Sequence, residues 1–231
     1  MFAKELTVKF FNLRLIGLAV FWLIGSLFWL APSYHVLQAQ PRVENTIKFG
    51  AMYFSTLNAY LKLDNKTTGT SALNSNSLTG VTIYGEKITQ SYFGYEVRFT
   101  PVQQEIIMTV DSAETTVQNT GILLGGSMRA YLKSHKRRGF NVYGAVNIGL
   151  LTTQMDFVIA PTGLKGKSYS TVTYVIGAEA GFDYLLRFAG VRAAAGYQYG
   201  GNTISTGADD IYRLRYTVAS PYWALGVFSF F

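Results

Sequence analysis

The sequence contains no cysteine, few charged residues and, beyond its N-terminal segment, no long uncharged apolar run. The absence of cysteine excludes a disulfide framework, a thiolate metal site and lipid attachment through an N-terminal cysteine. Charged residues make up 14% of the chain, whereas about 25% is usual in a soluble domain. The composition is therefore that of a membrane protein, but the roughly 18-residue apolar run of a membrane-spanning helix is missing.

Histidine is also scarce, with two in the whole chain. His35 lies in the N-terminal segment, which leaves His135 for acid–base or metal chemistry. Metal binding is not expected, because Ala208-Asp209-Asp210 is only a pair of loop carboxylates, open to no more than a weak calcium contact. The chain also lacks a Gly-rich phosphate-binding signature. We therefore expect no metal and no cofactor.

Glycine and aromatic residues are abundant, with 23 glycines, 16 tyrosines and 16 phenylalanines. This composition favours strands, tight bends and interfacial aromatic belts. The formal net charge is +7, and apart from Lys136-Arg137-Arg138 the charges are scattered through apolar sequence. Scattered charges fit the lumen and rims of a membrane protein better than a nucleic-acid site. No nucleic-acid partner is expected.

Residues 1–39 have the organisation of an export signal. A basic segment, MFAKELTVKFFNLR, precedes the apolar LIGLAVFWLIGSLFWLA, and small residues near Ala39 suit cleavage before Gln40. The apolar run is long for a signal peptide, so an uncleaved anchor helix over Leu15–Ala31 is the alternative. We expect cleavage, which divides the chain into a helical signal peptide over 1–39 and a domain over 40–231.

The rest of the chain alternates apolar residues with small, polar or charged ones at a period of two, which predicts strands. Val97, Leu124 and Ile176 belong to the apolar face, and Arg98 to the other. A soluble sandwich would bury the apolar face. However, several strands are longer than the usual strand of about five or six residues. Aromatic residues are concentrated towards strand ends, and an export leader is present. Tilted strands of about ten residues, closed so that no edge is exposed, fit all three features.

The sequence thus predicts an all-β protein, a transmembrane antiparallel up-and-down β-barrel of about eight strands. The predicted strands are 45–62, 88–100, 104–111, 117–133, 139–158, 169–185, 189–201 and 211–231. Three connections, TPVQQ, SHKRRG and LLRF, are short, and those at the other end are longer. Outer-membrane barrels have short periplasmic turns and long external loops. We therefore expect the loop over 64–87, rich in Asn, Ser, Thr and Gly, to lie outside and to contact an extracellular ligand of unknown identity.

The last predicted strand contains two conflicting phases. Arg213 and Arg215 are expected to face inward. That puts the residues of opposite parity on the lipid side: Tyr212, Leu214, Tyr216 and Val218. The apolar residues near the C-terminus share the parity of the arginines: Trp223, Leu225, Val227 and Phe231. A bulge at Ser220-Pro221 would reconcile the two phases. The alternative, without a change of phase, has three other residues facing lipid: Tyr222, Phe228 and Phe230.

The leader, the period-two strands and the terminal strand YWALGVFSFF together resemble small outer-membrane β-barrels of Gram-negative bacteria. The layout from IKFGAMYFSTLNAYLKLD through YFGYEVRFTPVQQEIIMTVD is similar to barrels of the opacity-protein and outer-membrane-protein-W types. The resemblance implies an outer-membrane location, contact with outer-membrane lipids and a C-terminal signal that the barrel-assembly machinery reads during biogenesis. On this sequence the signal comprises Trp223, Leu225, Val227 and Phe231. Ser229 departs from the pattern, because such tails often carry tyrosine.

An eight-stranded barrel encloses little more than its own side chains, so charges that point inward must be paired or hydrated. We predict a lumen ion-pair network that plugs and stiffens the barrel. Its expected members are Lys48, Glu96, Arg98, Glu105, Arg129, Glu179, Asp183, Arg192, Arg213 and Arg215. The alternative is a narrow pore for small solutes, which the excess of arginine over carboxylate would make mildly anion-preferring.

A lipid-modifying enzyme is a further alternative, because some small barrels use a histidine beside a serine near the outer leaflet. The base must reach its nucleophile at the membrane depth of the scissile ester. His135 and Ser134 are adjacent, but they lie in a turn that we predict to be periplasmic, so no catalytic residue is expected. The neighbouring Lys136, Arg137 and Arg138 predict either a solvated turn or a contact with inner-leaflet lipid phosphates.

The sequence therefore favours a non-enzymatic integral outer-membrane barrel with a structural or surface-interaction role. A monomer is expected, because a closed barrel satisfies its own backbone. The narrow pore, the lipid-modifying enzyme and a soluble periplasmic β-sandwich or lipocalin-like carrier are the alternatives. In the carrier, Val97, Leu124 and Ile176 would share a dry interior, while Arg98 and Arg129 would be in water.

Overall fold

The computed structural model describes residues 46–89, 92–132, 138–160, 164–204 and 211–231. The strands are β1 (Thr46–Thr56), β2 (Ala59–Asn65), β3 (Ser71–Asn76), β4 (Thr79–Thr89), β5 (Phe93–Val110), β6 (Ala113–Tyr131), β7 (Gly139–Ile159), β8 (Ser168–Leu185), β9 (Ala189–Ile204) and β10 (Tyr212–Phe230). These ranges contain no helix with the length and apolar character needed to cross a bilayer. The predicted signal peptide, residues 134–137 and Ala208-Asp209-Asp210 lie outside the described residues.

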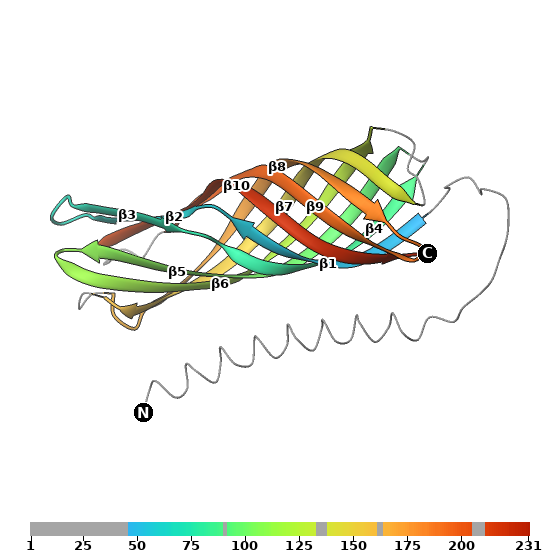
Figure 1. Ribbon diagram of the computed structural model, residues 1–231. Helices are drawn as coiled ribbons and strands as arrows, with labels where there is room; N and C mark the ends of the chain where they lie inside the picture. Colours follow the sequence, from blue (N-terminus) through green and yellow to red (C-terminus); the bar gives the residue numbers. More distant parts are fainter. Residues whose placement is uncertain (1–45, 90–91, 133–137, 161–163, 205–210) are drawn as a thin grey trace, which may run out of the picture. The chain divides into compact units, whose positions relative to one another are not determined.

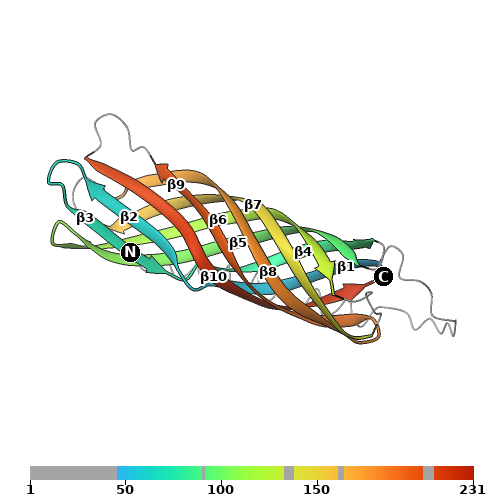
Figure 2. The same cartoon turned by 90° about the horizontal axis from the view of Figure 1, so that it is seen from above.

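Neighbouring strands pair antiparallel in the order β1-β4-β5-β6-β7-β8-β9-β10, and β10 pairs back with β1, which closes the barrel (Figure 1). β1 and β2 run in succession along β10, and β3 leads into β4, so each pair acts as one interrupted strand. Eight strand positions therefore surround the lumen. Figure 2 shows that the strands are tilted relative to the long axis of the barrel. The predicted up-and-down β-barrel is confirmed.

The described chain begins and ends at the same end of the barrel, where the Ile47 amide donates to the Phe231 carbonyl (3.2 Å). In this half, which we call the terminal half, apolar side chains point outward. Val97, Leu124 and Ile176 are 74%, 50% and 57% exposed, whereas Arg98 and Arg129 are 9% and 0% exposed. A soluble carrier requires the opposite arrangement. A closed barrel with an apolar exterior belongs in a membrane.

The exposed apolar residues form a band around the terminal half. On β7 the band runs from Phe140 to Leu150, and on β9 from Val191 to Tyr199. A tilted strand needs about 9–11 residues to cross the hydrocarbon core of a bilayer, and both lengths match this requirement. The band therefore fits one bilayer crossing per strand.

The other half of the barrel, the distal half, reverses the polarity of the two faces. On β5 the outward residues change from Phe99 to Gln103 and Glu105, while the inward ones change from Arg98 to Val102. We call the level of this exchange the inversion level. It lies at Pro101 on β5 and at Pro221 on β10. Beyond it most outward side chains are polar and most inward ones are buried and apolar, with Ile107 outside and Gln104 and Ser220 inside as exceptions.

An apolar cluster, the apolar plug, fills the lumen of the distal half. Its members are Ala59, Leu61, Leu63, Leu78, Val102, Ile106, Met108, Val110, Val117, Leu123, Leu151, Met155, Phe157, Leu164, Val175, Ile204, Tyr212, Leu214, Tyr216 and Val218. These side chains face one another across the barrel and are shielded from water by its wall. The distal half is therefore built like a small soluble β-sandwich, with a dry core and a wet exterior.

Two sheets of four strands form the wall of the distal half, one from β5 to β8 and the other from β9, β10, β2 and β3. Within the described residues, no ladder joins β3 to β5, and the β8–β9 ladder stops at Val175 and Gly200. Side-chain amides bridge both seams. Asn76 Nδ2 donates to the Glu105 carbonyl (2.8 Å), and Asn202 Nδ2 donates to the Val172 carbonyl (2.8 Å).

The predicted loop over 64–87 is wrong, and so is the division of residues 88–111 into two strands. Most of the first stretch forms β2, β3 and β4, and β5 runs unbroken through TPVQQ. Polar residues are frequent in β3 because this strand stands beyond the membrane band. Pro101 has no amide hydrogen, and the β4–β5 ladder is interrupted beside it, between Gly80–Val102 and Ile83–Phe99. The proline disturbs one ladder without ending the strand.

The predicted bulge at Ser220-Pro221 is also absent, since β10 pairs with β9 through these residues without a register shift. Arg213 and Arg215 are exposed on the outside, and Tyr212, Leu214, Tyr216 and Val218 are buried inside. The alternative phase is wrong for Tyr222 and Phe228, which are 4% and 1% exposed. The irregularity lies on the partner strand, where β1 ends and β2 begins. Opposite it, the Leu57 amide donates to the Pro221 carbonyl (2.9 Å), and the Asn58 amide donates to Ser220 Oγ (2.8 Å).

Candidate functional site: the barrel lumen

Eight charged side chains meet in the lumen of the terminal half. We call them the ionic network: Lys48 from β1, Glu86 from β4, Glu96 and Arg98 from β5, Arg129 from β6, Glu179 and Asp183 from β8, and Arg192 from β9. Asn147 of β7 and Tyr222 of β10 donate to Glu179 (3.2 and 2.6 Å). Every strand position of the barrel therefore contributes to the network.

Strand register brings these charges together. Glu86 lies directly opposite Lys48 on β1 and Glu96 on β5. Two glutamates opposite each other would repel, and Arg192 lies between them. Its Nη1 is 2.8 Å from Glu96 Oε2, and its Nη2 is 2.6 Å from Glu86 Oε2. Both glutamates therefore share one cation, which offsets the repulsion between their carboxylates.

Arg192 and Arg129 occupy the centre of the network and are 0% exposed. Arg192 Nε is 2.6 Å from Asp183 Oδ1, on the residue opposite it in the ladder. Arg129 contacts Glu86 (3.1 Å) and Glu179 (3.0 Å). The Arg129 guanidinium also lies 4.7 Å from the centre of the Tyr143 ring. Carboxylates and an aromatic face replace the water that these guanidinium groups lose on burial.

Lys48 and Arg98 are the two outermost cations of the network. Lys48 Nζ is 2.5 Å from Asp183 Oδ2 and 5.1 Å from the centre of the Phe228 ring, at the end near the termini. Arg98 is 2.7 Å from Glu96 and 3.3 Å from Glu179, on the side of the inversion level. Phe228 itself is 1% exposed. An apolar ring thus covers the network towards the termini.

The network is electrically balanced. Four cations face four carboxylates, and each of the eight forms at least one ion pair. The predicted arginine excess disappears because Arg213, Arg215 and Glu105 lie outside the lumen and Glu86 lies inside it. Sequence reasoning missed Glu86 because the residue fell in the predicted loop. The alternation of IYGEKI, with Tyr84, Glu86 and Ile88 on one face, was the signal that could have found it.

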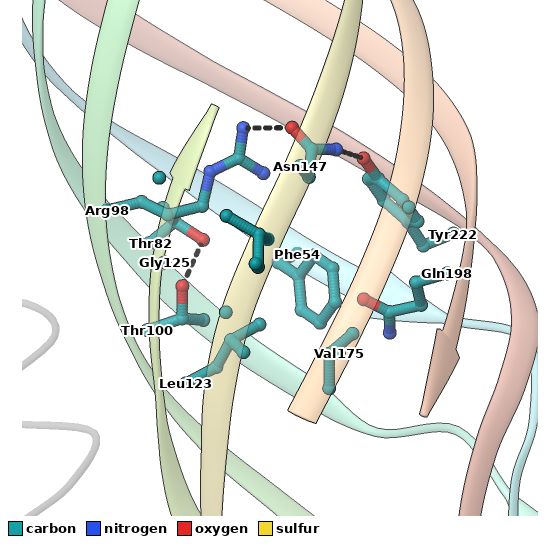
Figure 3. Close-up of a pocket in the computed structure, with 14 residues that line it drawn as sticks. Phe54, Thr82, Arg98, Thr100, Leu123, Gly125, Asn147, Val175, Gln198 and Tyr222 are labelled. Atoms are coloured by element: carbon teal, nitrogen blue, oxygen red, sulfur yellow. Dashed lines mark hydrogen bonds between the residues drawn. The ribbon is translucent and has the colours of Figure 1, made fainter. Parts of the chain in front are cut away.

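A cavity of about 30 Å³ separates the ionic network from the apolar plug. Figure 3 shows Arg98, Asn147 and Tyr222 on its network side and Phe54, Leu123 and Val175 on its plug side. The Thr82 and Thr100 hydroxyls share a hydrogen bond there (2.8 Å). This volume accommodates about two water molecules. The described residues contain no group of His, Cys, Asp and Glu side chains arranged to hold a metal ion.

The remaining predicted residues lie away from the lumen. Trp223 and Leu225 point outward at 43% and 57% exposure, and Phe231 is 80% exposed at the end of the chain. Val227 is half-buried on the same face. Arg138 is exposed next to β7, whereas Lys136, Arg137 and the pair Ser134 and His135 fall outside the described residues.

At the distal tip, a hydrogen-bonded clasp centred on Asp111 joins the two sheets. Asp111 and Ser112 form the turn between β5 and β6, both with positive φ (48° and 66°). The Asp111 carboxylate accepts hydrogen bonds from Asn65 Nδ2 (2.8 Å), Tyr212 OH (2.8 Å) and Thr70 Oγ1 (3.0 Å). These donors, Tyr212 first, hold the pKa of Asp111 below its ordinary value. Burial, together with Asp111, raises the pKa of Tyr212 to about 12, so Tyr212 remains a donor.

No protein-family model and no curated protein matches the sequence. Among solved structures, the outer-membrane protein OprG from Pseudomonas aeruginosa is 17% identical over 84% of this chain and 99% of OprG, with a TM-score of 0.59. Ail of Yersinia pestis is 14% identical over 82% of this chain and 100% of Ail (TM-score 0.42). Neisserial surface protein A is 15% identical over 78% of this chain and 96% of that protein (TM-score 0.44). The similarity to OprG shows that this chain has the fold of an outer-membrane β-barrel.

Proposed function

We propose that the protein is an integral outer-membrane barrel with a closed lumen and a structural or surface-interaction role, and that it is not an enzyme. The observation that carries this proposal is the double closure of the lumen. The ionic network closes the terminal half, the apolar plug closes the distal half, and the cavity between them measures about 30 Å³. The side chains of both closures are buried, so they fill the lumen on either side of this cavity.

The two closures would be costly to open for different reasons. A polar solute that passed the network would have to separate buried ion pairs, and a buried charge without its partner is strongly destabilising. The same solute would then have to enter the apolar plug, where a polar group loses hydrogen bonds to water without replacement. This combination argues against the narrow pore, whose charged lining would have to remain hydrated.

The fold also determines how the protein would meet a partner at the cell surface. Residues 64–87, in which we predicted a ligand contact, lie largely within β3 and β4. A ligand of this region would therefore contact strands held at the tip by Asp111, rather than a flexible loop. The proposal includes a leader over 1–39 that is cleaved before Gln40, and a monomeric state. It also includes insertion by the assembly machinery through Trp223, Leu225, Val227 and Phe231.

Conductance in planar bilayers tests the closed lumen. Purified protein that shows heat-modifiable gel mobility, and is therefore folded, should give no channel steps, while a porin in the same bilayer serves as the positive control. Stepwise conductance from the folded protein would overturn the proposal in favour of the narrow pore. Incubation with outer-membrane lipids, followed by mass spectrometry, tests the absence of enzymatic activity. A new acylated or deacylated product that disappears in His135→Ala would show that the protein is an enzyme.

A further inference from the structure

The outward side of β2 and β10 in the distal half carries a group of cations that the lumen does not use. We call Lys62, Arg213 and Arg215 the basic face. Arg215 lies directly opposite Lys62 in the β2–β10 ladder, and Arg213 lies opposite Asp64. Both arginines are exposed, while the residues that alternate with them, Tyr212, Leu214 and Tyr216, are buried. The three cations therefore project together from one side of the barrel.

The charge of the basic face is only partly neutralised by its surroundings. Lys62 Nζ is 2.9 Å from Asp64 Oδ1, and Asp64 also accepts a hydrogen bond from Ser71 Oγ (2.5 Å). Within the described ranges, neither Arg213 nor Arg215 forms an ion pair. Three cations with one carboxylate leave a net charge of +2 on this side. Both guanidinium groups keep their planar, multiple donors available for an anion.

On the strands of the opposite sheet, the outward charges have the other sign. In the distal half, the outward charged residues of β5, β6 and β7 are Glu105, Glu114 and Asp156, and the exposed cations of that sheet, Lys165 and Lys167, lie in the connection between β7 and β8. Among the strand faces of the distal half, the positive charge is thus concentrated on the β2–β10 side. An even spread would suit general solubility, whereas a one-sided concentration suits an anion that approaches from that side.

The basic face lies close to the membrane band. Tyr60, half-buried on the outward side of β2, lies two residues below Lys62. Tyr199, which is 59% exposed, lies opposite Ala219, four residues below Arg215 on β10. At about 3.4 Å per residue, these separations are about 7 and 14 Å along strands that tilt in the membrane. Aromatic side chains of this kind mark the membrane interface, so the cations stand at the level of lipid headgroups.

We propose that the basic face binds the phosphate groups of a lipid in the outer leaflet, such as a phosphorylated glycolipid. The inference rests on the proposed function, in which the tip of the distal half meets a partner at the cell surface. Arginine forms bidentate hydrogen bonds with phosphate, and Arg213 and Arg215 lie two residues apart on one face, so they can hold one headgroup from the same side. The acyl chains of that lipid then lie against the apolar band below, next to Tyr60 and Trp223.

Lipid retention tests the proposal. The full barrel is reconstituted in phosphatidylcholine nanodiscs that contain either diphosphorylated lipid A or the same glycolipid without phosphate, and the retained glycolipid is counted by native mass spectrometry. Wild type should retain the phosphorylated form preferentially, and the double variant Arg213→Gln/Arg215→Gln should lose this preference by at least about tenfold. Lys165→Gln, which removes an exposed cation next to β8, should retain it. Heat-modifiable mobility verifies that each variant is folded.

Three outcomes would overturn the proposal: equal retention of both glycolipids by wild type, unchanged preference in the double variant, or displacement of the lipid by inorganic phosphate at equal phosphate concentration. The last outcome would assign the site to a free anion. The result is separable from the conductance test. A silent barrel without lipid preference refutes only the lipid site, whereas a conducting barrel with lipid preference refutes only the closed lumen.

Discussion

Replacing Arg192 with leucine removes the cation that three carboxylates of the ionic network share. Arg192 lies 2.6 Å from Asp183, 2.6 Å from Glu86 and 2.8 Å from Glu96. Removing one partner of a buried ion pair typically costs about 3–5 kcal/mol. Arg129 still contacts the two glutamates, and Lys48 still contacts Asp183. We therefore expect the low end of that range, a loss of about 3 kcal/mol in the free energy of unfolding.

The double variant Arg192→Leu/Asp183→Leu separates charge imbalance from loss of packing. It restores equal numbers of cations and carboxylates, so it should be more stable than Arg192→Leu alone, although it changes more atoms. Lys62→Leu is the matched control. It breaks an ion pair whose side chains are 37% and 28% exposed, and such surface pairs contribute at most about 1 kcal/mol.

Urea unfolding in lipid vesicles, followed by tryptophan fluorescence, measures these differences. Trp223 is the only tryptophan after residue 39, so the fluorescence of protein prepared without residues 1–39 reports the barrel. If Arg192→Leu unfolds within about 1 kcal/mol of wild type, the network does not hold the barrel together. If the double variant is less stable than the single variant, charge balance is not the reason for the loss.

Three further predictions concern the band, the clasp and the membrane depth. Met128→Arg, on the outward face of β6 within the band, should destabilise the inserted barrel by about 2–4 kcal/mol and lower its heat-modifiable fraction. Thr120→Arg, on the same face but on the distal side of the inversion level, should leave that fraction unchanged. Equal losses in the two variants would contradict the assigned boundary. Because the pKa of Asp111 is lowered in the folded state, the clasp should be fully stabilising above about pH 4 and be lost as the pH falls through the folded-state pKa; NMR of the Tyr212 ring should follow this titration, and its persistence in Asp111→Asn would refute it. Trp223 should be quenched by lipids with brominated acyl chains, and quenching by aqueous acrylamide alone would exclude a lipid-facing position.

The barrel could be predicted from the sequence because the alternation of apolar and polar residues identifies a strand whether its apolar face contacts lipid or a protein core. Val97 and Arg98 alternate in the sequence as they do across the wall, so the lumen side of the terminal half could be assigned from parity alone. Closure of the barrel then brought together charges separated by as many as 135 positions, as in Lys48 and Asp183. Parity predicts which side chains point inward, but not which of them touch.

The distal half could not be predicted in the same way because its solvent is different. When a strand leaves the bilayer, water replaces lipid outside and apolar side chains replace charges inside, while the backbone continues unchanged. Along the sequence this exchange resembles a break in phase, so the pattern predicts a turn at TPVQQ and a bulge at Ser220-Pro221, and the structure has neither. The same exchange explains why parity predicts a lumen position for Arg213 and Arg215, which face outward.

The inversion level makes the barrel modular along its axis. The terminal half is filled by the ionic network and the distal half by the apolar plug. The charged side chains of the network pair with one another, and the plug residues pack against one another, so neither interior needs contacts from the other. Residues added in pairs to neighbouring strands beyond Pro101 and Pro221 would raise the projecting tip and extend its dry core, leaving the transmembrane register as it is. The height of the protein above the lipid surface can therefore vary independently of its anchorage.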